Sequence, residues 1–192
     1  MVTGSRMAAV MSKYKTEAKK NDETAERANY KMEVVVSRLT GLAIDHYVSP
    51  AMVWGIEHEE EARAAYELNT GAMVEPAGFA IHPTIQYFGA SPDGLLGSEG
   101  LLEIKCPESR THLEYVTAGT VPSEYLWQMC AELACTERKW VDFVSFDPRM
   151  PKHLRLFVRR YNRDDAKIAQ MEAEVVKFLG EVDAVIASLP KA

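Results

Sequence analysis

Residues 91–107 read Ser91-Pro-Asp-Gly-Leu-Leu-Gly-Ser-Glu-Gly-Leu-Leu-Glu-Ile-Lys-Cys-Pro107, and this stretch decides how we interpret the rest of the chain. Its glycines favour a turn, so we predict a hairpin that returns as an apolar strand. Glu103 and Lys105 are two residues apart and therefore point to the same face of that strand, with Asp93 alongside. Two carboxylates without sulfur or imidazole suit Mg²⁺ or Mn²⁺ better than zinc. Together with the lysine they are typical of a metal-dependent phosphodiesterase and indicate a nuclease.

The chain has 192 residues, 47% hydrophobic and 26% charged, which fits one globular domain with a buried core. It contains no run of about 18 uncharged apolar residues, so we expect no membrane span. The N-terminus has no apolar signal-peptide core, and we expect a cytoplasmic protein. The three cysteines, Cys106, Cys130 and Cys135, lack metal-ligand spacing and are predicted to be reduced and buried.

The net charge of −6 is unevenly distributed along the chain. Residues 138–163 contain eight basic and two acidic side chains, a local charge of +6, which leaves −12 for the remainder. A basic region on an acidic body is compatible with phosphate binding. The alternative for each arginine is a solvated face without a ligand, and the sequence leaves both interpretations open.

Periodicity predicts a single α/β domain with a mixed central sheet flanked by helices. We divide it into a mainly helical portion (1–70), a sheet core with one buried helix (71–163) and a C-terminal helix (164–192). A polar linker is expected between Pro107 and the buried helix. The predicted helices span about residues 24–39, 49–68, 123–136 and 164–189. The predicted strands span about residues 73–81, 85–90, 94–96, 101–105, 140–146 and 154–161.

Two polar residues stand out on the predicted helices. Glu59 lies in the middle of one helical stripe, which is formed by Met52, Ile56, Ala62, Arg63 and Tyr66. A buried glutamate is costly unless it is paired or binds a cation, so it either pairs with Arg63 or reaches the metal site. Gln128 sits in a helix that is apolar nearly all round, and it needs a partner that periodicity does not identify.

The N-terminal segment Val2-Thr3-Gly4-Ser5 precedes a short stretch of helical character. Thr3 or Ser5 could cap that helix and leave its free N–H groups as an anion site. The alternative is that Thr3 or Ser5 only caps the helix and binds no anion.

In these residues the chain resembles the lambda exonuclease-like (viral recombinase, YqaJ-type) family of the PD-(D/E)XK nuclease superfamily. A bare D…ExK pattern is common by chance, whereas the extended string is specific. The matching segments are Val2-Thr-Gly-Ser5, Trp54-Gly55 with Glu59, Ala62-Arg63 and Glu67, Ser91-Pro-Asp-Gly94, Leu102-Glu-Ile-Lys-Cys-Pro107, Gln128 and Asp147-Pro-Arg-Met150.

The resemblance implies a restriction-endonuclease-like core and a Mg²⁺-dependent exonuclease of the alkaline-exonuclease type. Family members degrade one strand of linear double-stranded DNA 5′ to 3′, form a trimeric ring, and supply single strands to an annealing protein during phage recombination. By resemblance we therefore expect three kinds of partner: double-stranded DNA ends, further copies of this chain and a single-strand annealing protein. The resemblance also implies a bacterial host that carries a phage or prophage.

The resemblance also assigns roles to residues. Asp93, Glu103 and the main-chain carbonyl of Ile104 would hold one or two Mg²⁺ ions, for which Mn²⁺ could substitute, and Glu59 would complete the second ion's shell. Lys105 would orient the attacking water and help to deprotonate it, with its pKa lowered by burial beside a cation. Gln128 would position that water or the scissile phosphate.

In the family, the segment that matches Thr3 and Ser5 helps to hold the terminal 5′-phosphate, together with an arginine. That arginine usually lies in a Trp-x₃-Arg-x-Gly stretch just upstream, which has no counterpart in this sequence. Either Arg6 or Arg110 replaces it, the true start lies upstream, or recognition of the 5′ end is weak.

Three other interpretations remain. An endonuclease or junction-cutting enzyme of the same superfamily would cut closed circular or branched DNA. A catalytically silent module would bind DNA ends and recruit recombination partners. In the third, residues 91–107 form only a hairpin with an exposed ion pair.

Overall fold

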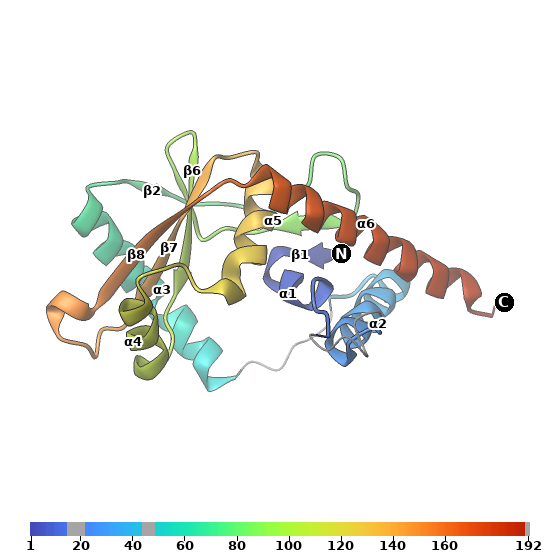
Figure 1. Cartoon of the computed structure of the whole chain (residues 1–192), viewed down its shortest axis with the longest axis horizontal. Helices are drawn as coiled ribbons and strands as arrows, with labels where there is room; N and C mark the ends of the chain where they lie inside the picture. The colour runs from blue at the N-terminus through green and yellow to red at the C-terminus, as the bar shows by residue number, and fades with distance from the viewer. Residues whose placement is uncertain (15–21, 44–48, 191–192) are drawn as a thin grey trace.

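The 91–107 hairpin lies in a mixed sheet of five strands (Figure 1). The computed structural model describes residues 1–14, 22–43 and 49–190. The strands of this sheet, in spatial order, are β2 (Val74–Glu75), β5 (Gly94–Leu96), β6 (Gly100–Lys105), β7 (Trp140–Phe146) and β8 (Leu156–Asn162). Strand β6 runs parallel to β7, whereas every other neighbouring pair is antiparallel. The predicted mixed sheet is confirmed.

A second sheet has three strands, in the order β1, β4 and β3. Its central strand β4 (Phe88–Ala90) pairs in parallel with β1 (Val2–Thr3) and antiparallel with β3 (Ala80–Ile81). The N-terminal segment is therefore part of a sheet, which the sequence did not predict because a strand of two residues carries no periodicity.

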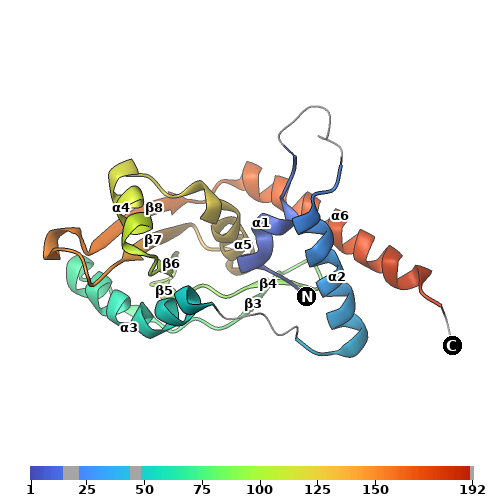
Figure 2. The ribbon, with the colours of Figure 1, turned by 90° about the horizontal axis from the view of Figure 1, so that it is seen from below.

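The helices flank these sheets. They are α1 (Met7–Val10), α2 (Ala25–Thr40), α3 (Pro50–Thr70), α4 (Ser109–Ala118), α5 (Leu126–Thr136) and α6 (Asp165–Ser188). Figure 2 shows α3 on one side of the five-stranded sheet and α4 and α5 on the other. None of the helices in the described part of the chain is long and apolar enough to cross a bilayer.

Alternation along β6 decides which side chains reach which layer. Leu101 and Phe143 belong to the larger core with α5, whereas Leu102 and Val144 pack with the α3 residue Tyr66. Glu103 shares the face of Leu101, so its side chain points toward α5 and not toward α3.

The predicted helix ends are confirmed by their caps. Thr24 accepts a hydrogen bond from Arg27 N at 3.2 Å, and Ser49 caps α3, with Pro50 in its first turn. Asp164 accepts from two main-chain N–H groups at the start of α6. Gly71 ends α3 with a φ of 71°, a left-handed conformation that favours glycine.

Two predictions about the sheet core are wrong. The expected strand 73–81 is two short strands in different sheets, because Pro76 lacks an N–H and Gly78 lies in the irregular segment between them. The expected polar linker after Pro107 contains α4, so this portion holds two helices. Its sequence has no clear apolar stripe, and His112 is buried there by hydrogen bonds to Ser145 Oγ and Leu154 O at 2.8 and 2.7 Å.

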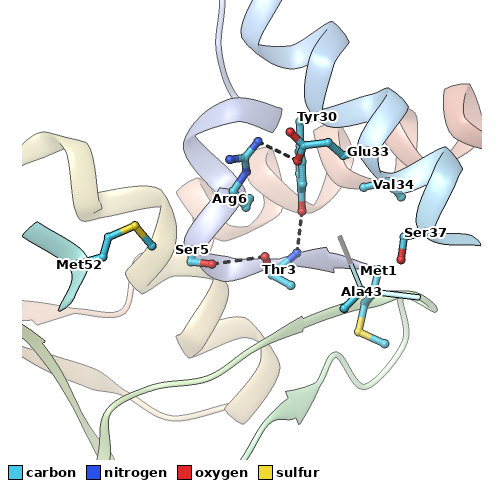
Figure 3. Close-up of a pocket in the computed structure, with 10 residues that line it drawn as sticks. All are labelled: Met1, Thr3, Ser5, Arg6, Tyr30, Glu33, Val34, Ser37, Ala43 and Met52. Carbon is cyan, nitrogen blue, oxygen red and sulfur yellow. Dashed lines mark hydrogen bonds and ion pairs between the residues drawn. The ribbon is translucent and has the colours of Figure 1, made fainter. Parts of the chain in front are cut away.

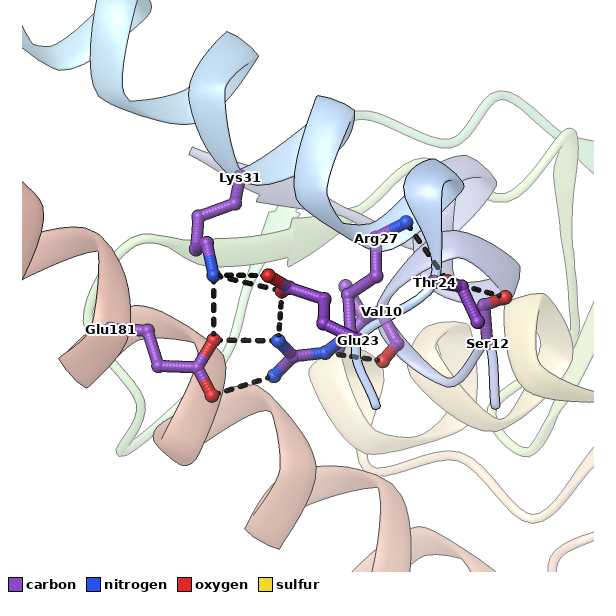
Figure 4. Close-up of polar contacts among 7 residues, drawn as sticks. All are labelled: Val10, Ser12, Glu23, Thr24, Arg27, Lys31 and Glu181. Atoms are coloured by element: carbon purple, nitrogen blue, oxygen red, sulfur yellow. Dashed lines mark hydrogen bonds and ion pairs between the residues drawn. The ribbon is translucent and has the colours of Figure 1, made fainter. Parts of the chain in front are cut away.

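A cluster of charged side chains forms ion pairs between helix α2 and helix α6 (Figure 4). Arg27, which is 7% exposed, donates to both carboxylate oxygens of Glu181 at 2.6 and 3.1 Å and to Glu23 at 2.6 Å. Lys31 contacts the same two glutamates. Burial raises the pKa of Glu181, but the hydrogen bonds and charge of Arg27 more than offset this and leave that pKa lowered.

We predict that Arg27→Met lowers the free energy of unfolding by about 2 kcal/mol, because it leaves partly buried carboxylates without their cation. Since the pKa of Glu181 is lowered in the folded state, this stabilisation is present above the ordinary value of 4.5 and is lost as the pH falls through the lowered value. Urea unfolding at pH 7 and pH 3 should therefore show a difference that shrinks in acid. Lys13→Met, which breaks an exposed pair with Glu174, is the control. An equal loss in both variants would contradict the prediction.

Candidate active site

The hairpin holds Asp93 against the end of β6. Asp93 N donates to Leu102 O at 3.0 Å, and its carboxylate oxygen Oδ2 accepts from Ile104 N at 2.6 Å. The N–H and C=O of one strand residue point to the same edge, so the Ile104 carbonyl also faces the Asp93 side. Gly94 allows β2 to lie close to β5, because a Cβ there would lie 2.4 Å from Val74 Cγ1.

Glu103 and Lys105 form an ion pair on the α5 face of β6. The Glu103 side chain is 1% exposed, and the Lys105 side chain is 26% exposed, with its ammonium 5.2 Å from the ring centroid of Tyr125. Burial lowers the pKa of Lys105, but the charge of Glu103 outweighs burial and raises it above its ordinary value. The lowered pKa expected beside a bound cation stays a prediction, because the nearest charge in the metal-free chain is an anion.

Helix α5 supplies the partner that Gln128 was expected to need. Gln128 Nε2 donates to Glu103 Oε1 at 2.5 Å and to Glu132 Oε1 at 3.0 Å. Glu132 is 1% exposed and was not among the predicted site residues. The signal was available in the sequence, since Glu132 lies one helical turn after Gln128 in an otherwise apolar helix.

The carboxylates of this site repel one another. Burial, followed by the charge of Glu103, raises the pKa of Asp93 to about 7. Burial and the same neighbour raise the pKa of Glu132. The second oxygens of Glu103 and Glu132 are buried and have no hydrogen-bond partner among the described residues.

A hard cation fits this environment, because it would partner a buried carboxylate oxygen and relieve the repulsion. Asp93, Glu103 and the Ile104 carbonyl are all oxygen donors. Within the described ranges, no group of three or more His, Cys, Asp or Glu side chains is arranged to hold a metal by itself. Such an ion would therefore need main-chain or water ligands as well.

Glu59 and Arg63 connect α3 to the hairpin. Arg63 donates to Glu59 Oε1 at 2.8 Å and to Asp93 O at 3.1 Å. The ion pair expected as the structural alternative is therefore present, and it also places the charge of Glu59 near Asp93, where it contributes to the raised pKa. The predicted burial of Met52 and Ile56 is wrong, since they are 50% and 70% exposed on the first turns of α3.

Thr3, Ser5 and Arg6 line one pocket of about 700 Å³ between the start of the chain, α2 and α3 (Figure 3). Thr3 does not cap a helix with its side chain, so the plain-cap alternative does not hold for it, and its Oγ1 lies 3.4 Å from Ser5 Oγ. Arg6 pairs with Glu33 at 3.0 Å and stacks over the ring of Tyr30.

Arg110 does not line this pocket. It lies on α4, its side chain is 89% exposed, and it pairs with Glu114. The structure therefore brings together three of the four predicted phosphate-binding residues.

The arginines of residues 138–163 bind the protein itself. Arg160 donates to both oxygens of Asp142 and lies over the ring of Trp140, and Arg149 donates to Asp147 at 2.7 Å. Four others donate to main-chain carbonyls: Arg138, Arg155, Arg159 and Arg163. These contacts favour a structural role for this basic segment.

The hairpin on its mixed sheet places the chain in the PD-(D/E)XK class, the restriction-endonuclease-like fold. Residues 1–139 match the model of the YqaJ-like viral recombinase domain, and the chain belongs to that family.

Solved structures support the same assignment. An alkaline exonuclease from Laribacter hongkongensis is 46% identical, with a TM-score of 0.87 over 97% of this chain and 89% of that chain. The structure of that exonuclease in complex with dAMP matches equally well. A phage-related exonuclease from Haemophilus somnus is 16% identical, with a TM-score of 0.73 over 98% of this chain and 96% of that chain, and supports the fold alone. Among curated proteins, no sequence matches the chain significantly.

Proposed function

We propose that this protein is a Mg²⁺-dependent exonuclease that degrades linear double-stranded DNA 5′ to 3′. The observation that carries the proposal is the convergence of Asp93, Glu103, Lys105 and Gln128 at one end of β6, where a buried carboxylate oxygen lacks a partner. The similarity to an alkaline exonuclease along nearly the whole chain supports exonuclease action.

Asp93, Glu103 and the Ile104 carbonyl would hold one or two ions, Mg²⁺ or Mn²⁺. Bound metal would supply Lewis-acid stabilisation of the attacking and leaving oxygens. Lys105 has the reach to orient the attacking water beside Glu103, and the ammonium also offsets the negative charge of the site. Glu59 adds a carboxylate from the α3 side, close enough to influence Asp93.

The product of this reaction would be a deoxynucleoside 5′-monophosphate. The complex of the Laribacter exonuclease with dAMP, a nucleotide of this class, supports the inference. The terminal 5′-phosphate would bind in the pocket of Thr3, Ser5 and Arg6, where two hydroxyl groups and a guanidinium can donate hydrogen bonds to it.

We further propose that the enzyme acts as a trimeric ring around the DNA, in the cytoplasm of a bacterial host, and supplies single strands to an annealing protein of phage origin. Exposed apolar residues on α2 and α3 support contacts between copies. They are Met32, Val36 and Leu39 on α2, and Met52, Val53 and Ile56 on α3.

The polarity and the phosphate pocket are tested together with linear duplexes whose strands carry either a 5′-phosphate or a 5′-hydroxyl. We predict that mononucleotides are released from the 5′ end first and that the phosphorylated end reacts faster. Arg6→Met should reduce this preference about tenfold, because it removes a charged hydrogen-bond donor.

Arg110→Met is the matched comparison, since Arg110 lies on α4 outside the pocket. A larger effect of Arg110→Met would contradict the assignment of the pocket. Release of nucleotides from the 3′ end first would contradict the polarity.

A further inference from the structure

The side-chain amide of Gln128 lies between two buried carboxylates. Its Nε2 donates to Glu103 Oε1 at 2.5 Å and to Glu132 Oε1 at 3.0 Å. Both glutamates are 1% exposed, and they come from different elements, β6 and α5. An amide nitrogen carries two hydrogens, so these two contacts use its full donor capacity.

This arrangement fixes which way the amide points. The opposite orientation would place the carbonyl oxygen of Gln128 against Glu103 Oε1, an acceptor that is already paired with Lys105. The carbonyl oxygen must therefore point away from Glu103 and Glu132. Gln128 consequently offers the reacting groups an acceptor and not a donor.

Glu103 alone could not maintain this orientation during the reaction. The same oxygen, Oε1, already contacts Lys105, and under the proposed function Glu103 also binds the cation. Glu132 is neither paired with Lys105 nor proposed to bind the cation. Its position is also costly, because its other oxygen is buried and has no partner among the described residues.

We infer that Glu132 is a positioning residue, and this inference rests on the proposed function. It holds the Gln128 amide so that the amide oxygen accepts a hydrogen bond from the attacking water and directs one of the water's lone pairs at the phosphorus. Gln128 then orients the nucleophile and does not bind the scissile phosphate, whose oxygens are acceptors and need donors.

The orientation can be tested without catalysis. The chain contains three glutamines, of which Gln86 and Gln170 are exposed. In wild-type protein labelled with ¹⁵N at glutamine side chains, the Gln128 NH₂ signals, identified by their loss in Gln128→Ala, should exchange with water more slowly than the other two pairs. Equal exchange rates for the three glutamines would overturn the inference without any variant at Glu132.

Variants at position 132 test its role in the reaction. Glu132→Met keeps the length of the side chain but removes the acceptor, and it should lower kcat about tenfold with KM unchanged. Glu132→Gln retains a carbonyl acceptor and should restore kcat to within about threefold of wild type. Glu99→Gln, the same chemical change in the turn before β6, is the control.

A double-mutant cycle separates positioning from general stability. If Glu132 acts through Gln128, Glu132→Met should cause no further loss of kcat in the Gln128→Ala background. Equal losses in both backgrounds would overturn the inference. An inactive wild-type protein with slowly exchanging Gln128 signals would instead contradict the proposed function while leaving the orientation intact.

Discussion

Lys105→Ala is expected to lower the rate of DNA cleavage about a thousandfold. Lys105 projects from the same face of β6 as Glu103, and its ammonium contacts the carboxylate that would bind the cation. In the metal-free chain the pKa of Lys105 is raised by this carboxylate, so the side chain is charged at neutral pH. Alanine removes both the group that would orient the water and the positive charge that is paired with Glu103.

The measurement is single-turnover cleavage of a linear duplex, with DNA binding measured in Ca²⁺ and folding measured by thermal unfolding. Binding should change little, because the 5′-phosphate would be held by Thr3, Ser5 and Arg6 in a pocket that Lys105 does not line. Lys139→Ala removes a lysine paired with Glu99 at the surface and is the control. A Lys105→Ala enzyme that cuts at the wild-type rate would contradict the assignment of β6.

Removal of divalent cations should abolish cleavage, and Mg²⁺ should restore it with an affinity that depends on pH. Burial and the charge of Glu103 raise the pKa of Asp93 to about 7 in the metal-free chain. Below that pH a proton must leave Asp93 before the cation binds, so the affinity falls as the pH falls. With one proton displaced, Mg²⁺ should bind about tenfold more weakly at pH 6 than at pH 8.

Titration calorimetry at the two pH values checks this directly. In Asp93→Asn the amide does not titrate, so the affinity should be weaker but nearly independent of pH between 6 and 8. A wild-type affinity that is the same at pH 6 and pH 8 would show that Asp93 carries no proton in the metal-free site.

Local rules predicted much of the fold. The caps at Thr24, Ser49 and Asp164 and the glycine at position 71 fixed helix ends, because each satisfies main-chain groups or a left-handed φ. The expected strand 140–146 is present and buried on both faces, although it carries Asp142 and Ser145. What failed depended on tertiary contacts, as in α4, where His112 is buried by partners 33 and 42 residues away.

In the candidate site, too, the sequence predicted the features that local geometry sets and missed those that depend on tertiary contacts. Residue spacing was sufficient to place Glu103 and Lys105 on one face, because period-two alternation is a property of the strand itself. Spacing also places Glu132 one helical turn after Gln128, but the contact of Gln128 with Glu103 arises only when α5 packs on β6. The resemblance to the family also implied a lowered pKa for Lys105, which would require the cation that these residues are proposed to bind.

Exonuclease action is tested by incubating matched linear and covalently closed circular duplexes with the enzyme and Mg²⁺, with Lys105→Ala alongside. We predict that the wild-type enzyme degrades only the linear duplex and that Lys105→Ala degrades neither. Cutting of the closed circle would contradict exonuclease action and indicate an endonuclease, whereas DNA binding without cleavage of either form would indicate a recruiting module.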